Sequence, residues 1–593
     1  AFDHDFDGIG DNEDGNNFDF GVISYSYDLP DQGVGEELGV AGDLWPATRH
    51  DRAASGASGG IGDLSTPVAG SRLFLGGLVD ADAVDVADVN GDGKEEVVMV
   101  SGGRVLAFRP DGSTLWSTPV LGAGVELLRG AGDLDGNGTT ELVALRRSKP
   151  GAVWVLRGAT GSVAFGEEDW AGDLAVSADM QLDGALLEDI TDDGLWELAL
   201  VGSAPGVLVR ARVYSFAAGI DAPQVIHHWD TEASMVGQTL LVGEVDGDGT
   251  RDLILQNGFG TVEVLPLDGE ALSVAGSAST DWLAGIVALR DVDGDWDDEI
   301  FSLRNAPGTK PDSIRVLDWQ GGGLVELWSD LTGAGGDTRT AYPWADPLAD
   351  LDGDGDLELI LSIQAGDTDW LLAVRDAATG AAIAMGPGLV PVEVIDVPGA
   401  GPVLICVTGA DDPYAFGGDA VAVRIVDGEL ETLWTLENVQ PAWGSRTRYP
   451  VGDTAGCLSG GGNCGLVHLT SDDVSWGLFL RDDDGDEKPE ILVQVDLADG
   501  AVLATQPLYN PSGIPRVTWR IPKAVRIGAL VRILQISSLG VARVLDGALN
   551  FKNNPYLLGS LGGAMPSFAS TAKGGAILHQ GTAMGRALRL IHD

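Results

Sequence analysis

One short acidic loop, repeated along the chain, constrains the fold more than any other feature of this sequence. Its fullest copy is Asp350-Leu-Asp-Gly-Asp-Gly-Asp-Leu-Glu358, with carboxylates at positions 1, 3, 5 and 9 and the apolar run Leu-Ile-Leu directly after it. Gly355 permits a tight turn, so these oxygens can converge on a hard cation such as calcium. A short apolar run is typical of a buried strand. The pattern therefore predicts a calcium loop that leads into a sheet.

Copies of this loop recur at intervals of 45 to 59 residues between residues 88 and 396. In a helix-flanked calcium loop the last acid stands at about position 12, so its place at position 9 argues for a different loop. Two copies carry Trp296 and Glu487 instead of the glycine, and the copy at Asp396 keeps only its first acid and is expected to bind no metal. The predicted calcium ligands of the seven filled loops are Asp88, Asn90, Asp92, Glu96, Asp133, Asp135, Asn137, Glu141, Asp189, Thr191, Asp193, Glu197, Glu244, Asp246, Asp248, Asp252, Asp291, Asp293, Asp295, Glu299, Asp350, Asp352, Asp354, Glu358, Asp482, Asp484, Asp486 and Glu490.

The interval between the loops is that of a four-stranded propeller blade. Further strands are visible inside it, as in residues 104–116, where an Asp-Gly turn separates two apolar segments. We therefore predict an all-β fold, a β-propeller of seven or eight blades, since larger rings are unusual. Residues 1–40 are expected to form an acidic calcium-binding arm, residues 41–440 the propeller, and residues 441–593 a C-terminal β region of further blades or an accessory domain.

The acidic loops resemble the calcium cages of FG-GAP (VCBS) repeat propellers, the family that includes the head of integrin α-subunits and many bacterial surface proteins. The resemblance covers roughly residues 45–500, although the Phe-Gly and Gly-Ala-Pro elements that name the family are mostly missing. It implies calcium at about seven sites. It also implies an extracellular, adhesive or ligand-binding scaffold more often than an enzyme.

Two segments ahead of the first loop carry resemblances of their own. Asp3, Asp5, Asp7 and Asp11 have a spacing similar to that of a thrombospondin type 3 repeat, which implies that they bind calcium; a disordered acidic terminus is the alternative. Residues 31–70 resemble the opening segment of bacterial propellers, in which an early strand pairs with the last blade. Such pairing would remove exposed sheet edges.

The charge balance limits the partners of this chain. With 90 acids against 35 bases the formal net charge is −55, which argues against nucleic-acid or anionic-membrane partners. No apolar run approaches the length of about 18 residues that crosses a bilayer. The chain begins at Ala1 without a basic and apolar leader, so we expect a mature, exported, extracellular product.

The chain has only three cysteines. Cys457 and Cys464 flank a glycine-rich segment and are expected to form a local disulfide, with two free thiols as the alternative. Cys406 lies in the apolar run Val-Leu-Ile-Cys-Val and is expected in the core.

Catalysis has little support in the sequence. The seven histidines are scattered, and none stands in a zinc-binding spacing. We therefore expect a non-enzymatic surface scaffold or adhesion protein, whose ligand is a protein, a glycan or another copy of the chain. Two alternatives stay open: a subunit of a polymeric extracellular appendage, and a carbohydrate-binding protein or polysaccharide lyase on a calcium propeller. The second alternative rests on tryptophans in or beside turn-rich segments, where an exposed ring could stack on a sugar: Trp170, Trp196, Trp296, Trp344 and Trp443.

Overall fold

The chain divides into two units, residues 1–38 and residues 39–593. All residues that the computed structural model describes belong to the second unit. They are residues 68–74, 84–93, 96–109, 113–148, 151–166, 181–204, 208–231, 239–256, 261–279, 284–304, 312–331, 338–341, 343, 346–365, 369–408, 418–426, 428–441, 466–471, 474–483, 490–508, 519–527, 530–537, 541–550, 556–557, 567–570, 576–579 and 586–591.

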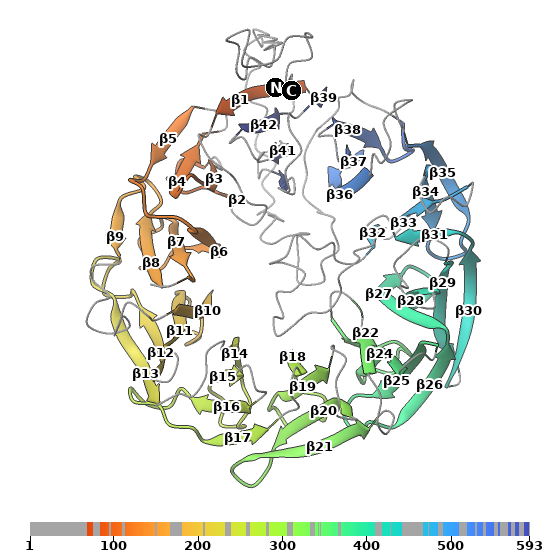
Figure 1. The fold of residues 1–593 in the computed structure, drawn as a ribbon, viewed down its shortest axis with the longest axis horizontal. Helices are drawn as coiled ribbons and strands as arrows, with labels where there is room; N and C mark the ends of the chain where they lie inside the picture. Colours follow the sequence, from red (N-terminus) through yellow and green to blue (C-terminus); the bar gives the residue numbers. More distant parts are fainter. Residues whose placement is uncertain are drawn as a thin grey trace, which may run out of the picture. The chain divides into compact units, whose positions relative to one another are not determined.

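The described residues form strands and turns and contain no helix. Their strands make ten antiparallel sheets of four or five strands each (Figure 1). The first four of these sheets are β2 (Val84–Ala87), β3 (Glu96–Ser101), β4 (Arg104–Phe108) and β5 (Thr114–Ser117); β6 (Glu126–Gly132), β7 (Glu141–Arg146), β8 (Ala152–Arg157) and β9 (Val163–Phe165); β10 (Gln181–Glu188), β11 (Glu197–Ala204), β12 (Leu208–Ser215) and β13 (Gln224–Thr231); and β14 (Thr239–Gly243), β15 (Asp252–Gln256), β16 (Thr261–Pro266) and β17 (Gly276–Ser279).

The next three sheets continue in chain order, one of them with a short fifth strand. They are β18 (Ala284–Arg290), β19 (Glu299–Arg304), β20 (Asp312–Trp319) and β21 (Leu324–Leu331); β22 (Thr338–Ala341), β24 (Glu358–Ala365), β25 (Leu371–Asp376) and β26 (Ala382–Pro387), with β23 (Leu348–Ala349) paired to β24; and β27 (Leu389–Val397), β28 (Gly401–Thr408), β29 (Ala420–Val426) and β30 (Glu429–Leu436). After these comes the sheet of β31 (Val439–Pro441), β33 (Val474–Arg481), β34 (Ile491–Asp496) and β35 (Val502–Pro507), with β32 (Val467–Ser471) paired to β33.

Two further sheets use the remaining strands. One is β36 (Trp519–Ile527), β37 (Leu530–Ser537), β38 (Val541–Asp546) and β39 (Tyr556–Leu557), and the other is β1 (Val68–Phe74), β42 (Arg586–Ile591), β41 (Ala576–His579) and β40 (Ser567–Ser570). In the last sheet β1 pairs with β42, with Val68 opposite Ile591. The expected pairing of an early strand with the last blade is therefore confirmed.

The core lies between successive sheets. One apolar cluster joins Leu145 and Val155 of the sheet β6–β9 to Leu198, Leu200 and Phe216 of the sheet β10–β13. Similar clusters join each neighbouring pair of sheets from β2–β5 to β31–β35. Because both faces of a sheet are covered, its second strand is buried along its length, as in β3 and β15. This explains why apolar runs rather than alternating patterns follow the acidic loops.

Four-stranded sheets that pack on one another in chain order make this fold a β-propeller. The seven or eight blades expected from the sequence are not confirmed, because the described residues form ten sheets and those beyond residue 441 fold in the same way. The domain boundary expected at residue 440 stays a prediction. β31 spans this boundary and pairs with β33 in one sheet.

Tryptophans on outer strands fasten one sheet to the next. Trp116 of β5 donates its Nε1 hydrogen to the carbonyl of Gly158, 2.6 Å away, just after β8. Its ring lies against Gly161, where a Cβ atom would come within 2.3 Å of the indole. The same contacts join Trp328 to the Ala377 carbonyl and Gly380, and Trp434 to the Leu497 carbonyl and Gly500. A buried or half-buried indole thus gains a hydrogen bond at each of these junctions.

Candidate metal centres

Each acidic loop from Asp88 to Asp350 leads into the second strand of its sheet, whereas the loop at Asp482 joins β33 to β34, the second and third strands of theirs. The loop from β6 to β7 begins at Asp133, which accepts the backbone N–H groups of Asn137 (2.9 Å) and Gly138 (2.7 Å). Asp135 accepts the Asn137 N–H as well, at 3.2 Å. These bonds fold the backbone around the first two acids, so that their carboxylates face inward rather than into solvent.

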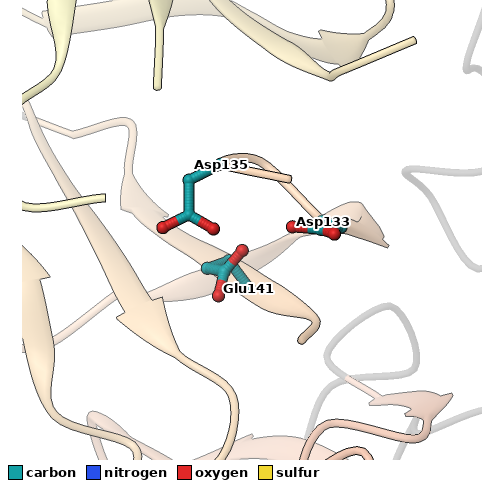
Figure 2. Close-up of side chains that lie close together, drawn as sticks. All are labelled: Asp133, Asp135 and Glu141. Atoms are coloured by element: carbon teal, nitrogen blue, oxygen red, sulfur yellow. The ribbon is translucent and has the colours of Figure 1, made fainter. Parts of the chain in front are cut away.

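The last acid of the loop completes a cluster of carboxylates. Glu141 is the first residue of β7 and is only 1% exposed. Figure 2 shows its carboxylate beside those of Asp133 and Asp135, and one oxygen of each lies within 4.8 Å of the others. Three further predicted loops bring three carboxylates equally close, and all four clusters could hold a metal ion. The other three are Glu244, Asp246 and Asp248; Asp291, Asp293 and Asp295; and Asp350, Asp352 and Glu358.

A repeated hydrogen bond holds the last acid in place. In the first example the backbone N–H of Leu134, at position 2 of the loop, donates to Glu141 Oε2 at 3.1 Å. The same bond runs from Ile190 to Glu197, from Val245 to Asp252, from Val292 to Glu299, from Leu351 to Glu358 and from Asp483 to Glu490. A single local rule of nine residues therefore positions one carboxylate at the start of the strand that follows each of these loops.

The other oxygen of this acid is left without a partner in several loops. Glu197 Oε1, Asp252 Oδ1 and Glu299 Oε1 are buried and accept no hydrogen bond. A buried carboxylate oxygen without a partner is costly, and burial of this kind is usually balanced by a cation or a proton. The free oxygens are therefore an observation that favours a bound cation.

Burial also shifts the acid–base equilibrium of these groups. It raises the pKa of Glu96, Glu141, Asp252 and Glu358 to about 7, and neighbouring loop carboxylates add to the increase. The pKa of Glu299 is raised further, to about 8, for the same reasons. In the absence of a cation these carboxylates therefore resist ionisation near neutral pH. A bound divalent cation would favour the ionised form and lower the pKa of these carboxyls again.

The remaining predicted ligands divide into three groups. The loops at Asp88 and Asp189 have the same backbone bonds, but within the described part of the chain they do not bring three acids together, since Asn90 and Thr191 occupy position 3. The loop at Asp482 is described only in part. Outside the described residues lie Asp484, Asp486, Asp3, Asp5, Asp7 and Asp11.

One carboxylate cluster includes residues that the sequence reasoning did not select. Asp297 and Asp318 lie close to Asp295, with one oxygen of each within 4.8 Å of the others. Asp297 stands at position 7, which is not among the positions 1, 3, 5 and 9 that carry the predicted ligands. Asp318 belongs to β20 and comes after Leu317, the partner of Ile300, so it lies across from Glu299. The strand register, which the sequence does not state, would have been needed to find it.

The tryptophans behind the carbohydrate alternative have different surroundings. The Trp296 ring is 84% exposed, and its residue has a positive φ of 84°. Trp196 is half-buried and packs against the core between the sheets β6–β9 and β10–β13, where its ring covers Gly132, so it is less available to a sugar than Trp296. Trp170, Trp344 and Trp443 lie outside the described residues.

Two further sequence expectations concern the cysteines and membrane-spanning segments. Cys406 is a free, buried core residue, as expected, whereas Cys457 and Cys464 lie outside the described residues. The part of the chain that the structure describes has no helix with the length and apolar character needed to cross a membrane.

The fold and its loops define a class: an all-β propeller with acidic clusters that could hold metal ions. No family model matches the sequence, and no curated protein matches it. Similar solved structures include a europium-containing methanol dehydrogenase (TM-score 0.38, 11% identity, 93% of this chain and 98% of that one). They also include the rhamnogalacturonan lyase YesW (0.38, 15%, 77% and 78%) and a quinohemoprotein alcohol dehydrogenase from Comamonas testosteroni (0.36, 11%, 93% and 80%). These likenesses are too distant to indicate a ligand or an activity.

Proposed function

We propose that this protein is a calcium-stabilised propeller of the FG-GAP (VCBS) kind, exported and acting at the cell surface as a non-enzymatic binding scaffold. The observation that carries the proposal is the repeated loop, which brings three carboxylates together in four blades and leaves buried carboxylate oxygens without a partner in several. Its partner would be a protein, a glycan or a second copy of the chain.

The ligand chemistry favours calcium over other common metals. The clusters contain only carboxylates, and the loops add backbone carbonyls and no cysteine or histidine. Calcium takes about six to eight oxygen ligands in flexible geometry, whereas zinc and copper favour nitrogen and sulfur. A loop of nine residues with up to four carboxylates therefore suits calcium.

A bound ion would stabilise the blade as well as the loop. The ligands come from the end of the inner strand, the turn and the first residue of the second strand, as in Asp133 and Glu141 around β6 and β7. The unfolded chain does not hold these oxygens together, so binding energy becomes folding energy. A rigid scaffold of this kind would present its connecting loops to a partner.

The non-enzymatic part of the proposal rests on the role of the loop carboxylates as proposed calcium ligands. Carboxylates that share one ion are not available as a general acid and base. The net charge of −55 also disfavours polyanionic partners.

Calorimetry tests the calcium proposal. Free calcium at about one hundred times its dissociation constant adds about 2.7 kcal/mol for each independent site that the unfolded chain lacks. We expect the melting temperature to rise clearly when calcium is added to metal-free protein and to fall again with a chelator. An unchanged melting temperature would contradict the proposal.

The exposed ring of Trp296 favours carbohydrate binding as a second candidate function. It stands between Asp295 and Asp297 and could stack on a sugar while calcium contacts hydroxyl groups. A glycan array, combined with an absorbance assay for lyase activity on acidic polysaccharides, separates the two candidates. Glycan binding that is lost in Trp296→Ala would favour the carbohydrate function. No glycan binding and no lyase activity would favour the scaffold function.

A further inference from the structure

We infer that the loop between β18 and β19 holds two cations rather than one, with Asp295 between them and with Asp297 and Asp318 completing the second site. The inference builds on the proposed calcium loops but concerns a site that the repeat does not contain. Its ligand would be a second calcium ion.

Two carboxylate clusters meet in this loop. Asp291, Asp293 and Asp295 form the cluster that the repeat predicts, and Asp295, Asp297 and Asp318 form another. In each cluster the oxygens lie within 4.8 Å of one another, and Asp295 belongs to both. A carboxylate has two oxygens and about four lone-pair directions, so one aspartate can serve two ions.

Asp318 supplies the observation that a loop of acids alone would not. It is 1% exposed, and although Oδ2 accepts a hydrogen bond from Gln320 Nε2, its buried Oδ1 accepts none. Asp297 is also buried, at 6% exposure. Two buried carboxylates beside a third would repel one another strongly unless a positive charge lies among them.

Two other blades have an arginine at the position of Asp318. Glu141 pairs with Arg157 across β7 and β8, and Arg109 follows Phe108, the partner of Val97, so it lies across from Glu96. In those two blades a positively charged residue therefore stands opposite the last acid of the loop in the strand register. Here a carboxylate takes the place of the positive charge, so a second cation would restore the balance that arginine gives elsewhere.

The next blade supplies a matched control. Asp376 pairs with Glu358 across β24 and β25, the same relative position as Asp318. However, Asp376 Oδ1 already accepts hydrogen bonds from the Thr379 backbone N–H (2.6 Å) and hydroxyl (2.7 Å). It is committed to a turn and therefore should not bind a second ion.

The test counts calcium ions on the full chain. Native mass spectrometry in saturating calcium, checked by atomic emission after gel filtration, compares wild type with Asp318→Asn and Asp376→Asn. We expect Asp318→Asn to lose one calcium per chain and Asp376→Asn to lose none. An unchanged count in Asp318→Asn, or an equal loss in both variants, overturns the inference. A wild type that binds no calcium would instead refute the proposed calcium loops themselves.

A second readout guards against a general folding defect. Trp296 stands between Asp295 and Asp297 in the sequence, so terbium bound at this loop should emit when tryptophan is excited. The Trp296-dependent emission is the terbium emission that is lost when Trp296→Phe is introduced into the same protein, whether wild type or variant. We expect this emission to fall in Asp318→Asn and to persist in Asp376→Asn, with similar melting curves for both variants in calcium. An undiminished Trp296-dependent emission in Asp318→Asn would mean that one ion occupies the loop.

Discussion

Replacing Glu358 by glutamine should stabilise the metal-free protein at pH 8 and destabilise the calcium-bound protein. Glu358 is 2% exposed, and its Oε2 accepts the backbone N–H of Leu351 at 2.6 Å. Burial, followed by the charges of Asp352 and Asp350, raises the pKa of this carboxyl from 4.5 to about 7. Glutamine keeps an oxygen that can accept the Leu351 N–H but carries no charge.

The sign and size of the effect follow from the pKa of Glu358. Its folded value lies above its unfolded value, so the folded state loses relative stability as pH rises from 4.5 to about 7. Each pKa unit corresponds to about 1.4 kcal/mol, which sets an upper limit of about 3 kcal/mol above pH 7. Below pH 4.5 the carboxyl is protonated in both states, and the advantage of glutamine disappears.

Thermal unfolding followed by circular dichroism measures the effect. Metal-free Glu358→Gln should have a higher melting temperature than wild type at pH 8 and the same melting temperature near pH 4.5. In millimolar calcium it should have a lower melting temperature than wild type, because glutamine binds calcium less well. Glu429→Gln, at an exposed position of β30, is the control and should change little. A metal-free Glu358→Gln that melts below wild type at pH 8 would refute the reasoning.

Three further predictions concern other parts of the molecule. Trp434→Phe removes the donor to the Leu497 carbonyl and should lower stability by about 1–3 kcal/mol in thermal unfolding; no change would argue against the tryptophan junction. Trp296→Gly relieves a positive φ of 84° and should raise the melting temperature of metal-free protein, and a decrease would contradict this. Because Cys406 is fully buried, peptide mapping after alkylation should find it modified only in unfolded protein, whereas modification in the native state would contradict its burial.

The acidic loops could be predicted from sequence because their geometry is local. Asp133 and Glu141 are eight positions apart, and backbone hydrogen bonds within the same nine residues decide where both carboxylates point. The buried strand that follows is equally visible as a short apolar run. The sequence therefore predicted the β-propeller and four of the carboxylate clusters.

Features that depend on contacts between strands could not be predicted in this way. Asp318 joins Asp295 only through the register of β19 with β20, and Trp196 is covered by packing between two sheets. The sheets of residues 519–591 have no acidic loop to mark them. Their strands were visible, but nothing in the sequence showed that they would form sheets like those before them.

Crystals grown in millimolar calcium would test the central claim most directly, through the anomalous signal of calcium at the acidic loops. The account predicts ions at the loops that begin at Asp133, Glu244, Asp291 and Asp350, about 2.3–2.6 Å from the carboxylate oxygens. Ordered loops without ions at this calcium concentration would contradict it, since protons would then balance the buried carboxylates.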